Sequence, residues 1–275
     1  MVKKLPRSLM NKYEKLQSAM RNKGKLLIAF SGGVDSALLA KAAYDVLGAN
    51  AWAVLIDSET VPEFELSSAA KLAAELGINF DVIRINQLLD DNFTRNDYNR
   101  CYFCRRAMAK HLITFANKKG ITAIAAGAQE TDLHDFRPGI RAFHEKKIWH
   151  PFIELGITKD EIRRLAKYLE LPVAEKPSMA CLSSRVPYDQ KITVEVLKMV
   201  AGAEEYLRKL GFTQYRARTH GKMLRIEINE NEFDKLMANR KQIIKKMNEL
   251  GYQYITLDLE GFRSGSMNEV LTHKK

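Results

Sequence analysis

Residues 26–36 read LLIAFSGGVDS, in which five apolar residues run directly into two glycines and an aspartate between two serines. A short apolar run bounded by glycines is typical of a buried strand, and glycines let the backbone turn sharply and approach a ligand. Residues 37–48, ALLAKAAYDVLG, predict a helix that ends at Gly48. The unpaired amides at the start of that helix would point at the turn, where a phosphate group is the expected ligand.

The loop at 31–36 differs from the two common glycine-rich phosphate loops. It lacks the lysine that GxxxxGK[ST] requires, and it does not match GxGxxG. Its amides are instead flanked by the hydroxyl groups of Ser31 and Ser36, and the carboxylate of Asp35 can hold Mg²⁺ on a pyrophosphate. A tight turn without a ligand is the alternative, but the hydroxyl and carboxylate groups favour a nucleotide site.

Strand and helix patterns alternate after residue 25. Apolar strand patterns recur at 51–57, 80–85 and 121–128, with helix patterns between them at 66–77 and 105–120. This alternation predicts an α/β fold with a doubly wound parallel sheet, whose ligands bind outside the carboxyl ends of the strands. After residue 188 a helix (193–211), a hairpin (213–228), a helix (230–251) and a strand (252–259) predict a smaller α+β domain. We therefore expect an N-terminal helix at 1–24, a nucleotide domain at 25–188 and a second domain at 189–275.

The net charge of +11 in 275 residues is concentrated at the N-terminus, because residues 1–25 hold eight Lys or Arg and one Glu. Within them Leu9, Tyr13, Leu16 and Met20 form one stripe of an amphipathic helix. A docked helix with a solvated basic face is favoured over contact with a polyanion. No apolar run approaches the roughly 18 residues of a membrane helix, and no secretory signal is evident, so we expect a cytoplasmic protein.

The stretch SGGVDS after an apolar strand resembles the PP-loop of the ATP pyrophosphatases, which split ATP between its α and β phosphorus atoms. Together with five further stretches, the chain is similar along nearly its whole length to the LarE group of sulfur transferases, which build the nickel-pincer nucleotide cofactor. These stretches are LIDSETVP (55–62), NRCYFCR (99–105), GAQETDLHDFRPG (127–139), PFIELGITKDEIRRLA (151–166) and KPSMACLSSRVPY (176–188). The resemblance implies Mg²⁺ and ATP bound by Ser31, Gly32, Gly33, Asp35, Ser36, Asp57, Ser58 and Gly127.

The three cysteines, Cys101, Cys104 and Cys181, offer three thiolates, the first two about one helical turn apart. Three is one fewer than the four thiolates that normally hold a 4Fe–4S cluster, so one iron would stay open. The spacing alone does not separate such a cluster from a zinc site completed by a histidine, or from unlinked thiols. The resemblance favours the cluster, because LarE-like proteins with three cysteines resemble enzymes that carry sulfide on the free iron, whereas those with one sacrifice its sulfur.

The stretch QYRARTHG places Arg216, Arg218 and His220 on one face of a predicted strand. Two guanidinium groups can grip a phosphate, and the similarity to LarE supports binding of a mononucleotide there. A solvated hairpin edge is the alternative. Arg185, close after Cys181, is expected to hold a carboxylate or the AMP phosphate.

The resemblance implies that the chain adenylylates a carboxylate of pyridinium-3,5-biscarboxylic acid mononucleotide and converts it to a thiocarboxylate with sulfide carried on a 4Fe–4S cluster. Partners are then the small mononucleotide, a sulfur donor of unknown identity and further copies of the chain in a homo-oligomer. Two alternatives remain: a cluster-dependent tRNA thiolase and a zinc-stabilised nucleotide-binding regulator. Nucleic-acid binding is not expected, since there are no additional CxxC pairs for zinc ribbons.

Overall fold

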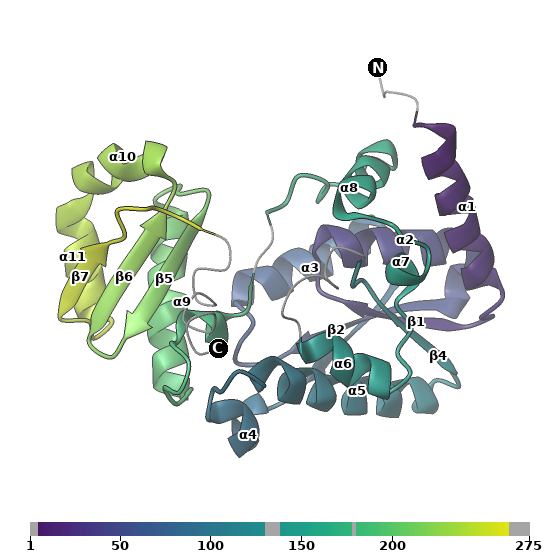
Figure 1. Cartoon of the computed structure of the whole chain (residues 1–275), viewed down its shortest axis with the longest axis horizontal. Coiled ribbons are helices and arrows are strands. Elements are labelled where there is room, and N and C mark those ends of the chain that lie inside the picture. Colours follow the sequence, from purple (N-terminus) through teal and green to yellow (C-terminus); the bar gives the residue numbers. More distant parts are fainter. Residues whose placement is uncertain (1–4, 130–137, 178–179, 264–275) are drawn as a thin grey trace, which may run out of the picture. The chain divides into compact units, whose positions relative to one another are not determined.

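The apolar run before the glycines forms a central strand of a parallel sheet, β1 (Leu26–Phe30). It pairs in parallel with β2 (Ala51–Asp57) on one side and with β4 (Ala123–Ala126) on the other, and β3 (Asn79–Arg84) lies beyond β2. The order β3-β2-β1-β4 confirms the predicted parallel α/β sheet (Figure 1). The computed structural model describes residues 5–129, 138–177 and 180–263.

The direction in which the chain adds strands reverses beside β1. From β1 it proceeds to β2 and β3, and it then returns to the opposite side of β1 to form β4. In the register of these strands, Leu26 lies opposite both Ala51 and Ala123. Parallel sheets bind ligands at the carboxyl ends of the strands where the order reverses. The predicted ligand loop therefore leaves the sheet at this reversal point.

Helices cover both faces of this sheet, as predicted. Leu26, Ile28 and Phe30 belong to the core beneath α2, whereas Leu27 belongs to the core beneath α5. This alternation buries the strand on both sides, which explains why its sequence is apolar without interruption. The helices of this part of the chain are α1 (Arg7–Arg21), α2 (Val34–Leu47), α3 (Glu63–Glu75), α5 (Arg100–Lys118), α6 (Pro138–Glu145), α7 (Pro151–Glu154) and α8 (Lys159–Tyr168).

Helix α1 docks through the predicted apolar stripe. Its buried residues are Leu9, Tyr13, Leu16 and Met20. Burial raises the pKa of Tyr13 to about 12, so its hydroxyl stays protonated at neutral pH. Among the described helices, none combines the length and apolar character needed to cross a membrane.

The chain forms two compact units. The first comprises Met1–Gln87 and Asn99–Met179, and the second comprises Leu88–Tyr98 and Ala180–Lys275. Asn96 explains why a short inner segment joins the second unit: its buried amide donates to the carbonyl oxygens of Pro187 (2.7 Å) and Gln190 (2.9 Å). The predicted domain boundaries after residues 24 and 188 stay predictions.

The second unit contains a smaller, three-stranded sheet. Strands β5 (Tyr215–His220) and β6 (Met223–Ile228) form the predicted hairpin, and β7 (Tyr254–Leu257) pairs in parallel with β6. Its other elements are α4 (Asp91–Thr94), the 3₁₀ turn η4 (Leu182–Arg185), α9 (Val194–Lys209), α10 (Phe233–Ala238) and α11 (Arg240–Glu249). Residues from α9 and α11 pack with one face of the sheet to form its apolar core.

The sequence predicted a single helix over residues 230–251. This prediction is wrong, because the helix is interrupted at Asn239. There α10 ends and α11 begins. The side-chain amide of Asn239 donates to the carbonyl oxygen of Lys235 at 2.7 Å, which satisfies an acceptor in the last turn of α10. A side chain that hydrogen-bonds a carbonyl oxygen near the end of a helix competes with the backbone hydrogen bonds that would extend that helix.

Gly32 makes the sharp exit from β1 possible. Its φ of +69° lies in the left-handed region, and a Cβ there would lie 2.7 Å from Cβ of Ala69 in α3. The glycine therefore lets α3 pack directly against the loop.

We expect Gly32→Ala to lower the free energy of unfolding by about 2–4 kcal/mol, because left-handed strain adds to an overpacked contact. Gly24→Ala is the matched control: Gly24 has the same φ of +69°, but nothing lies within 4 Å of its Cβ position. It should cost only about 1 kcal/mol. Urea unfolding measures both, and equal losses would contradict the role of the Ala69 contact.

Candidate functional site

The loop after β1 is held in shape by its own hydroxyl groups. Ser36 Oγ accepts a hydrogen bond from the N–H of Ser31 and donates one to the carbonyl oxygen of Gly33, both at 3.1 Å. Ser36 is buried, whereas Ser31 is exposed beside it, with the two Oγ atoms 3.1 Å apart. Ser36 therefore shapes the loop, and Ser31 offers a hydroxyl at its surface.

Gly127, directly after β4, lies against the first turn of α2. A Cβ at this position would lie 3.1 Å from Cβ of Asp35 and from the backbone nitrogen of Ser36. A larger residue would push the end of β4 away from the loop. The structure thus brings Gly127 together with the loop residues at the reversal point of the sheet.

Asp57 is the last residue of β2, the strand beside β1, and Ser58 follows it directly. The Asp57 carboxylate lies 3.8 Å from Nε of Arg84, and the buried Ser58 hydroxyl lies 3.0 Å from Oγ1 of Thr60. Because the carboxyl ends of parallel strands share one edge of a sheet, the predicted ATP-binding residues after β1, β2 and β4 gather at that edge.

Two lysines at this edge were not predicted from the sequence. Lys159, the first residue of α8, donates to both carboxylate oxygens of Asp35 at 2.6 Å. Lys176 donates to Glu65 Oε2 at 2.6 Å and to the carbonyl oxygen of Gly32 at 3.3 Å. Both lie in stretches that resemble the LarE group, but neither the spacing nor the resemblance had indicated that the amines reach the loop.

This edge of the sheet can bind a phosphate ester with a divalent cation. Backbone amides at the start of α2 and the Ser31 hydroxyl provide hydrogen-bond donors. Asp35 provides oxygen ligands of the kind that Mg²⁺ prefers. Ammonium groups from Lys159 and Lys176 add positive charge that the loop itself lacks.

Cys101 and Cys104 lie in the first turns of α5, with Cys101 exposed and Cys104 half-buried. Because they are three residues apart, they share one side of the helix. Cys104 Sγ accepts a hydrogen bond from Nε2 of the buried Gln87 at 3.1 Å. A hydrogen bond of this kind orients a side chain that could act as a metal ligand.

Cys181 belongs to the second unit, where it is exposed and immediately precedes the 3₁₀ turn η4. Its Sγ lies 3.5 Å from Oγ of Ser183, and its carbonyl oxygen accepts a hydrogen bond from Arg185 at 3.1 Å. Within the described residues, no group of three or more His, Cys, Asp or Glu side chains is arranged to hold a metal ion.

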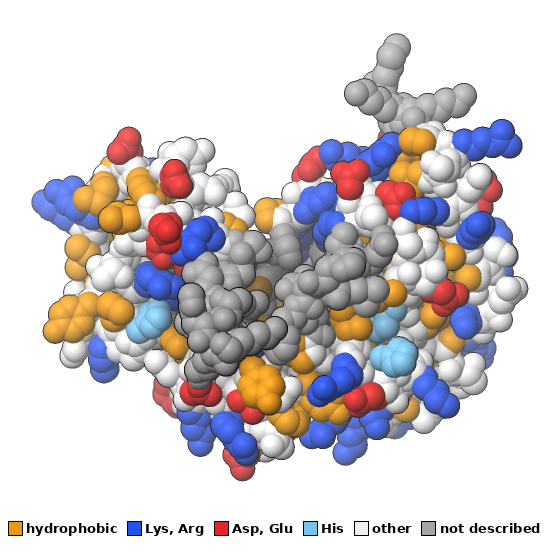
Figure 2. Space-filling view, in the orientation of Figure 1, with side chains coloured by type: hydrophobic (Ala, Val, Ile, Leu, Met, Phe, Trp, Pro, Cys, Tyr) orange, Lys and Arg blue, Asp and Glu red, His pale blue; other side chains and the backbone are white. Residues whose placement is uncertain are grey.

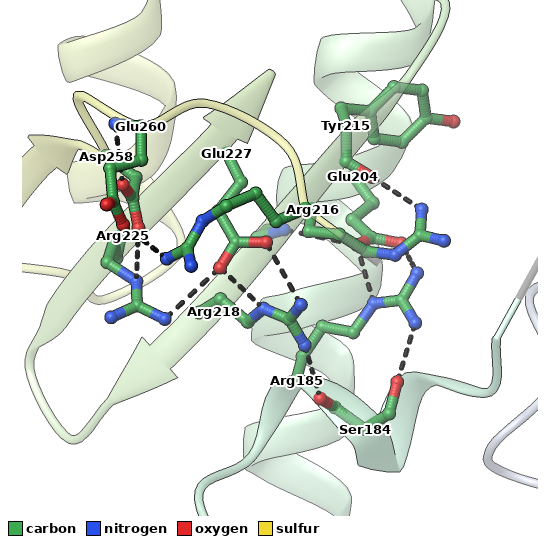
Figure 3. Close-up of polar contacts among 12 residues, drawn as sticks. Ser184, Arg185, Glu204, Tyr215, Arg216, Arg218, Arg225, Glu227, Asp258 and Glu260 are labelled. Atoms are coloured by element: carbon green, nitrogen blue, oxygen red, sulfur yellow. Dashed lines mark hydrogen bonds and ion pairs between the residues drawn. The ribbon is translucent and has the colours of Figure 1, made fainter. Parts of the chain in front are cut away.

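Two of the predicted substrate arginines of the second unit form buried ion pairs (Figure 3). Arg185 binds both carboxylate oxygens of Glu204, at 2.7 and 2.9 Å, and Arg218 binds both of Glu227, at 2.9 and 3.0 Å. All four side chains are at most 5% exposed. Arg185 and Arg218 therefore have a structural role, and their predicted contact with substrate stays a prediction.

Arg216 has contacts of a different kind. Its Nη1 donates to the carbonyl oxygen of Tyr215 at 2.7 Å, and its guanidinium lies 4.9 Å from the ring centre of Phe262. Burial, followed by repulsion from Arg185, lowers the pKa of Arg216 to about 10, so it remains charged at neutral pH. A cation whose charged form is disfavoured by its surroundings gains from the approach of an anion.

His220, the third member of the predicted cationic face, does not add a charge at neutral pH. Burial lowers its pKa from the ordinary value of 6.5, and the nearby Arg225 lowers it further. The face is therefore made of arginines and their carboxylates. The sequence reasoning missed Glu204 and Glu227.

Comparisons with known proteins find relatives that match nearly the whole chain. Residues 7–133 match the family model described as NAD synthase. The chain is 40% identical over 266 residues to the uncharacterized protein slr1717 of Synechocystis sp., covering 96% of this chain and 99% of that protein. It is 35% identical to the pyridinium-3,5-bisthiocarboxylic acid mononucleotide synthase of Lactiplantibacillus plantarum, covering 96% of each. It is 32% identical to the tRNA-specific 2-thiouridylase MnmA of Leptospira biflexa, covering 58% of this chain and 52% of that protein.

Adjacent glutamates of α9 test the energetic role of the buried pairs. Glu204→Gln leaves the guanidinium of Arg185 buried without its counter-charge, and we expect it to lower the free energy of unfolding by about 3–5 kcal/mol. Glu205→Gln removes only the exposed pair with Lys209 and should cost about 0.5 kcal/mol or less. Urea unfolding of both variants gives the comparison, and similar losses would show that burial does not distinguish the pairs.

Proposed function

Because this chain belongs to the LarE family of PP-loop ATP pyrophosphatases, which includes the pyridinium-3,5-bisthiocarboxylic acid mononucleotide synthase, we propose that it is an ATP-dependent sulfur transferase acting on a pyridinium mononucleotide. The similarity over 96% of both chains carries this proposal. The loop at 31–36 supports it, since its donors, Asp35 and the neighbouring lysines suit a nucleotide phosphate with Mg²⁺.

The first half-reaction is adenylylation. A carboxylate oxygen of pyridinium-3,5-biscarboxylic acid mononucleotide attacks the α-phosphorus of ATP, the bond from that phosphorus to the bridging oxygen breaks, and pyrophosphate leaves. Amides at the start of α2 stabilise the negative charge on the phosphate oxygens, and Asp35 holds Mg²⁺. The acyl adenylate then carries AMP as its leaving group.

The second half-reaction transfers sulfur. Sulfide attacks the activated acyl carbon, the bond to AMP breaks, and a thiocarboxylate results; a second round converts the other carboxylate. A 4Fe–4S cluster held by Cys101, Cys104 and Cys181 would supply this sulfide. The pair on α5 suits such a group, because both cysteines lie on one side of the helix and Gln87 donates a hydrogen bond to the sulfur of Cys104. A zinc site is the alternative for the same cysteines.

We assign the substrate phosphate to Arg216, which is buried and stays charged at neutral pH although burial lowers its pKa to about 10. Arg185 and Arg218 each hold a buried glutamate, and Arg185 also binds the carbonyl oxygen of Cys181. Their role in this proposal is to fix the strand and the cysteine, while Arg216 provides the positive charge for the anion. The sulfur donor and a homo-oligomeric state belong to the same proposal.

A tRNA thiolase is the second candidate, supported by the similarity to MnmA. That similarity covers 58% of this chain and 52% of MnmA, whereas the mononucleotide synthase matches nearly end to end. On the face shown in Figure 2, Lys and Arg side chains are interspersed with Asp and Glu. The small-molecule substrate is therefore favoured.

With the mononucleotide and MgATP, we expect the products AMP and pyrophosphate, and ADP with orthophosphate would contradict adenylylation. Asp35→Ala should lower pyrophosphate release by about 100-fold or more, because it removes the Mg²⁺ ligand. Asp45→Ala is the control, since Asp45 lies on the same helix in a pair with Lys41. Its rate should stay within about twofold of wild type if only exposed pairing is lost.

Alanine variants of the three cysteines distinguish two sources of sulfur: sulfide carried on a cluster, and the sulfur of a cysteine side chain. If all three hold one cluster, Cys101→Ala, Cys104→Ala and Cys181→Ala should each lose iron, acid-labile sulfide and thiocarboxylate formation, while pyrophosphate release persists. Anaerobic purification with iron and sulfide analysis measures this. The opposite outcome would indicate that Cys181 gives up its own sulfur. In that case Cys101→Ala and Cys104→Ala stay active, and Cys181 loses the mass of H₂S after turnover.

A further inference from the structure

Helix α5 carries positive charge without a counter-charge of its own. Its 19 residues include five Lys or Arg and no Asp or Glu. Arg106 and Lys110 are four residues apart on this helix, a spacing at which like charges repel and destabilise the helix. Helix formation therefore does not account for this composition.

The short helix α6 lies against the first turns of α5 (Figure 1). The Tyr102 hydroxyl of α5 donates to Glu145 Oε2 of α6 at 2.7 Å. The guanidinium of Arg141, also on α6, lies 4.5 Å from the ring centre of Tyr102. Cys101, the residue before this tyrosine, is exposed. Cations from both helices are therefore close to one of the proposed sulfur-handling cysteines.

We call the exposed cations of this region the basic surface. It consists of Arg105, Arg106, Lys110, Arg141, Lys146 and Lys147, the last two directly after α6. In the part of the chain that the structure describes, only Arg141 among them lies within ion-pair distance of a carboxylate, Glu145 at 3.7 Å. Exposed like charges without partners repel one another, and an anionic partner relieves that repulsion.

The surroundings of the basic surface favour a protein as that partner. Arg106 lies 5.8 Å and 5.1 Å from the ring centres of Tyr102 and Phe103, so guanidinium groups already contact both rings on which nucleic-acid bases would stack. The Glu145 carboxylate beside them repels phosphates. Arginine and tyrosine are enriched in the cores of protein interfaces. A second copy of this chain, with its own net charge of +11, is not complementary.

We propose that the basic surface is where an acidic protein docks beside Cys101. The proposed function needs a sulfur donor at the cysteines, and the inference deepens it by assigning that donor to proteins with an acidic surface. This assignment rests on the proposed function, whereas attraction of an acidic chain to the basic surface does not. Complementary charge of this kind steers partners together and weakens with salt.

Disulfide exchange at Cys101 tests the attraction on the full chain. In Cys104→Ser/Cys181→Ser, Cys101 is the only thiol. The probes are two synthetic peptides with a cysteine activated as a thionitrobenzoate disulfide, one rich in glutamate and the other in glutamine. We expect the glutamate peptide to react about 10-fold faster at low salt and less than about twofold faster at about 1 M salt. The ratio of the two rates cancels the intrinsic reactivity of the thiol.

Charge reversal at two positions of α5 locates the effect. Arg106→Glu, five residues from Cys101, should reduce the ratio of rates to about twofold or less. Lys118→Glu is the matched control, because Lys118 is exposed on the same helix but lies roughly 25 Å along it from Cys101, beyond the Debye length of about 10 Å. It should leave the ratio within about twofold of the parent. Equal losses in both variants would show an effect of overall charge and would overturn the proposal.

Filter binding with tRNA decides between a protein and a nucleic acid. We expect no tRNA affinity that depends on the basic surface, so Arg106→Glu and Lys118→Glu should behave alike. A loss of about 10-fold or more in tRNA affinity in Arg106→Glu alone would assign the surface to nucleic acid and contradict the proposal.

These outcomes are distinguishable from failure of the proposed function. If the wild type releases no pyrophosphate with MgATP and the mononucleotide, adenylylation is wrong, while the ratio of peptide rates still decides the docking surface. If pyrophosphate is released and both peptides react equally fast at low salt, the docking proposal alone is wrong. Circular dichroism of Arg106→Glu and Lys118→Glu confirms that each variant is folded.

Discussion

The close approach of three backbone segments beside β1 is the constraint on which the proposed nucleotide site depends. Gly32 admits α3 to the loop, and Gly127 admits the end of β4 to the first turn of α2. Neither contact leaves room for a side chain, so the donors and carboxylates of the loop are fixed by backbone packing. The sheet contributes the rest, because the reversal of strand order opens its edge at this point.

The ion pairs of the two units differ in their exposure to solvent. At the loop of the first unit, Asp35 and Lys159 remain partly exposed, so water reaches their ion pair. In the second unit, Glu204 and Glu227 are almost fully buried, and each binds an arginine through two oxygens. Such pairs fix geometry and resist rearrangement, since separating them leaves a buried charge. The protein therefore combines a partly exposed ion pair at the loop of the first unit with a buried arginine cluster in the second unit.

The sequence predicted what depends on local pattern. The apolar run before SGGVDS indicated β1, and period-two alternation in QYRARTHG placed Arg216 and Arg218 on one face, as the structure has them. It did not predict Lys159 at Asp35, because that contact depends on where α8 docks. Glu227 could have been predicted from the sequence, because counting residues back from the hairpin turn places it opposite Arg216 in the strand register. The break at Asn239 depends on a single side-chain hydrogen bond, which a helical pattern does not reveal.

Glu204 also has a consequence for how copies of the chain meet. In the described part of the chain β5 pairs only with β6, so its other side is a sheet edge. Glu204 Oε1 accepts the N–H of Ala217 on that strand at 3.1 Å, in addition to binding Arg185. An edge strand with unpaired N–H groups is a template for strands from neighbouring molecules. The carboxylate that anchors an arginine therefore also occupies an edge N–H that an added strand would otherwise use.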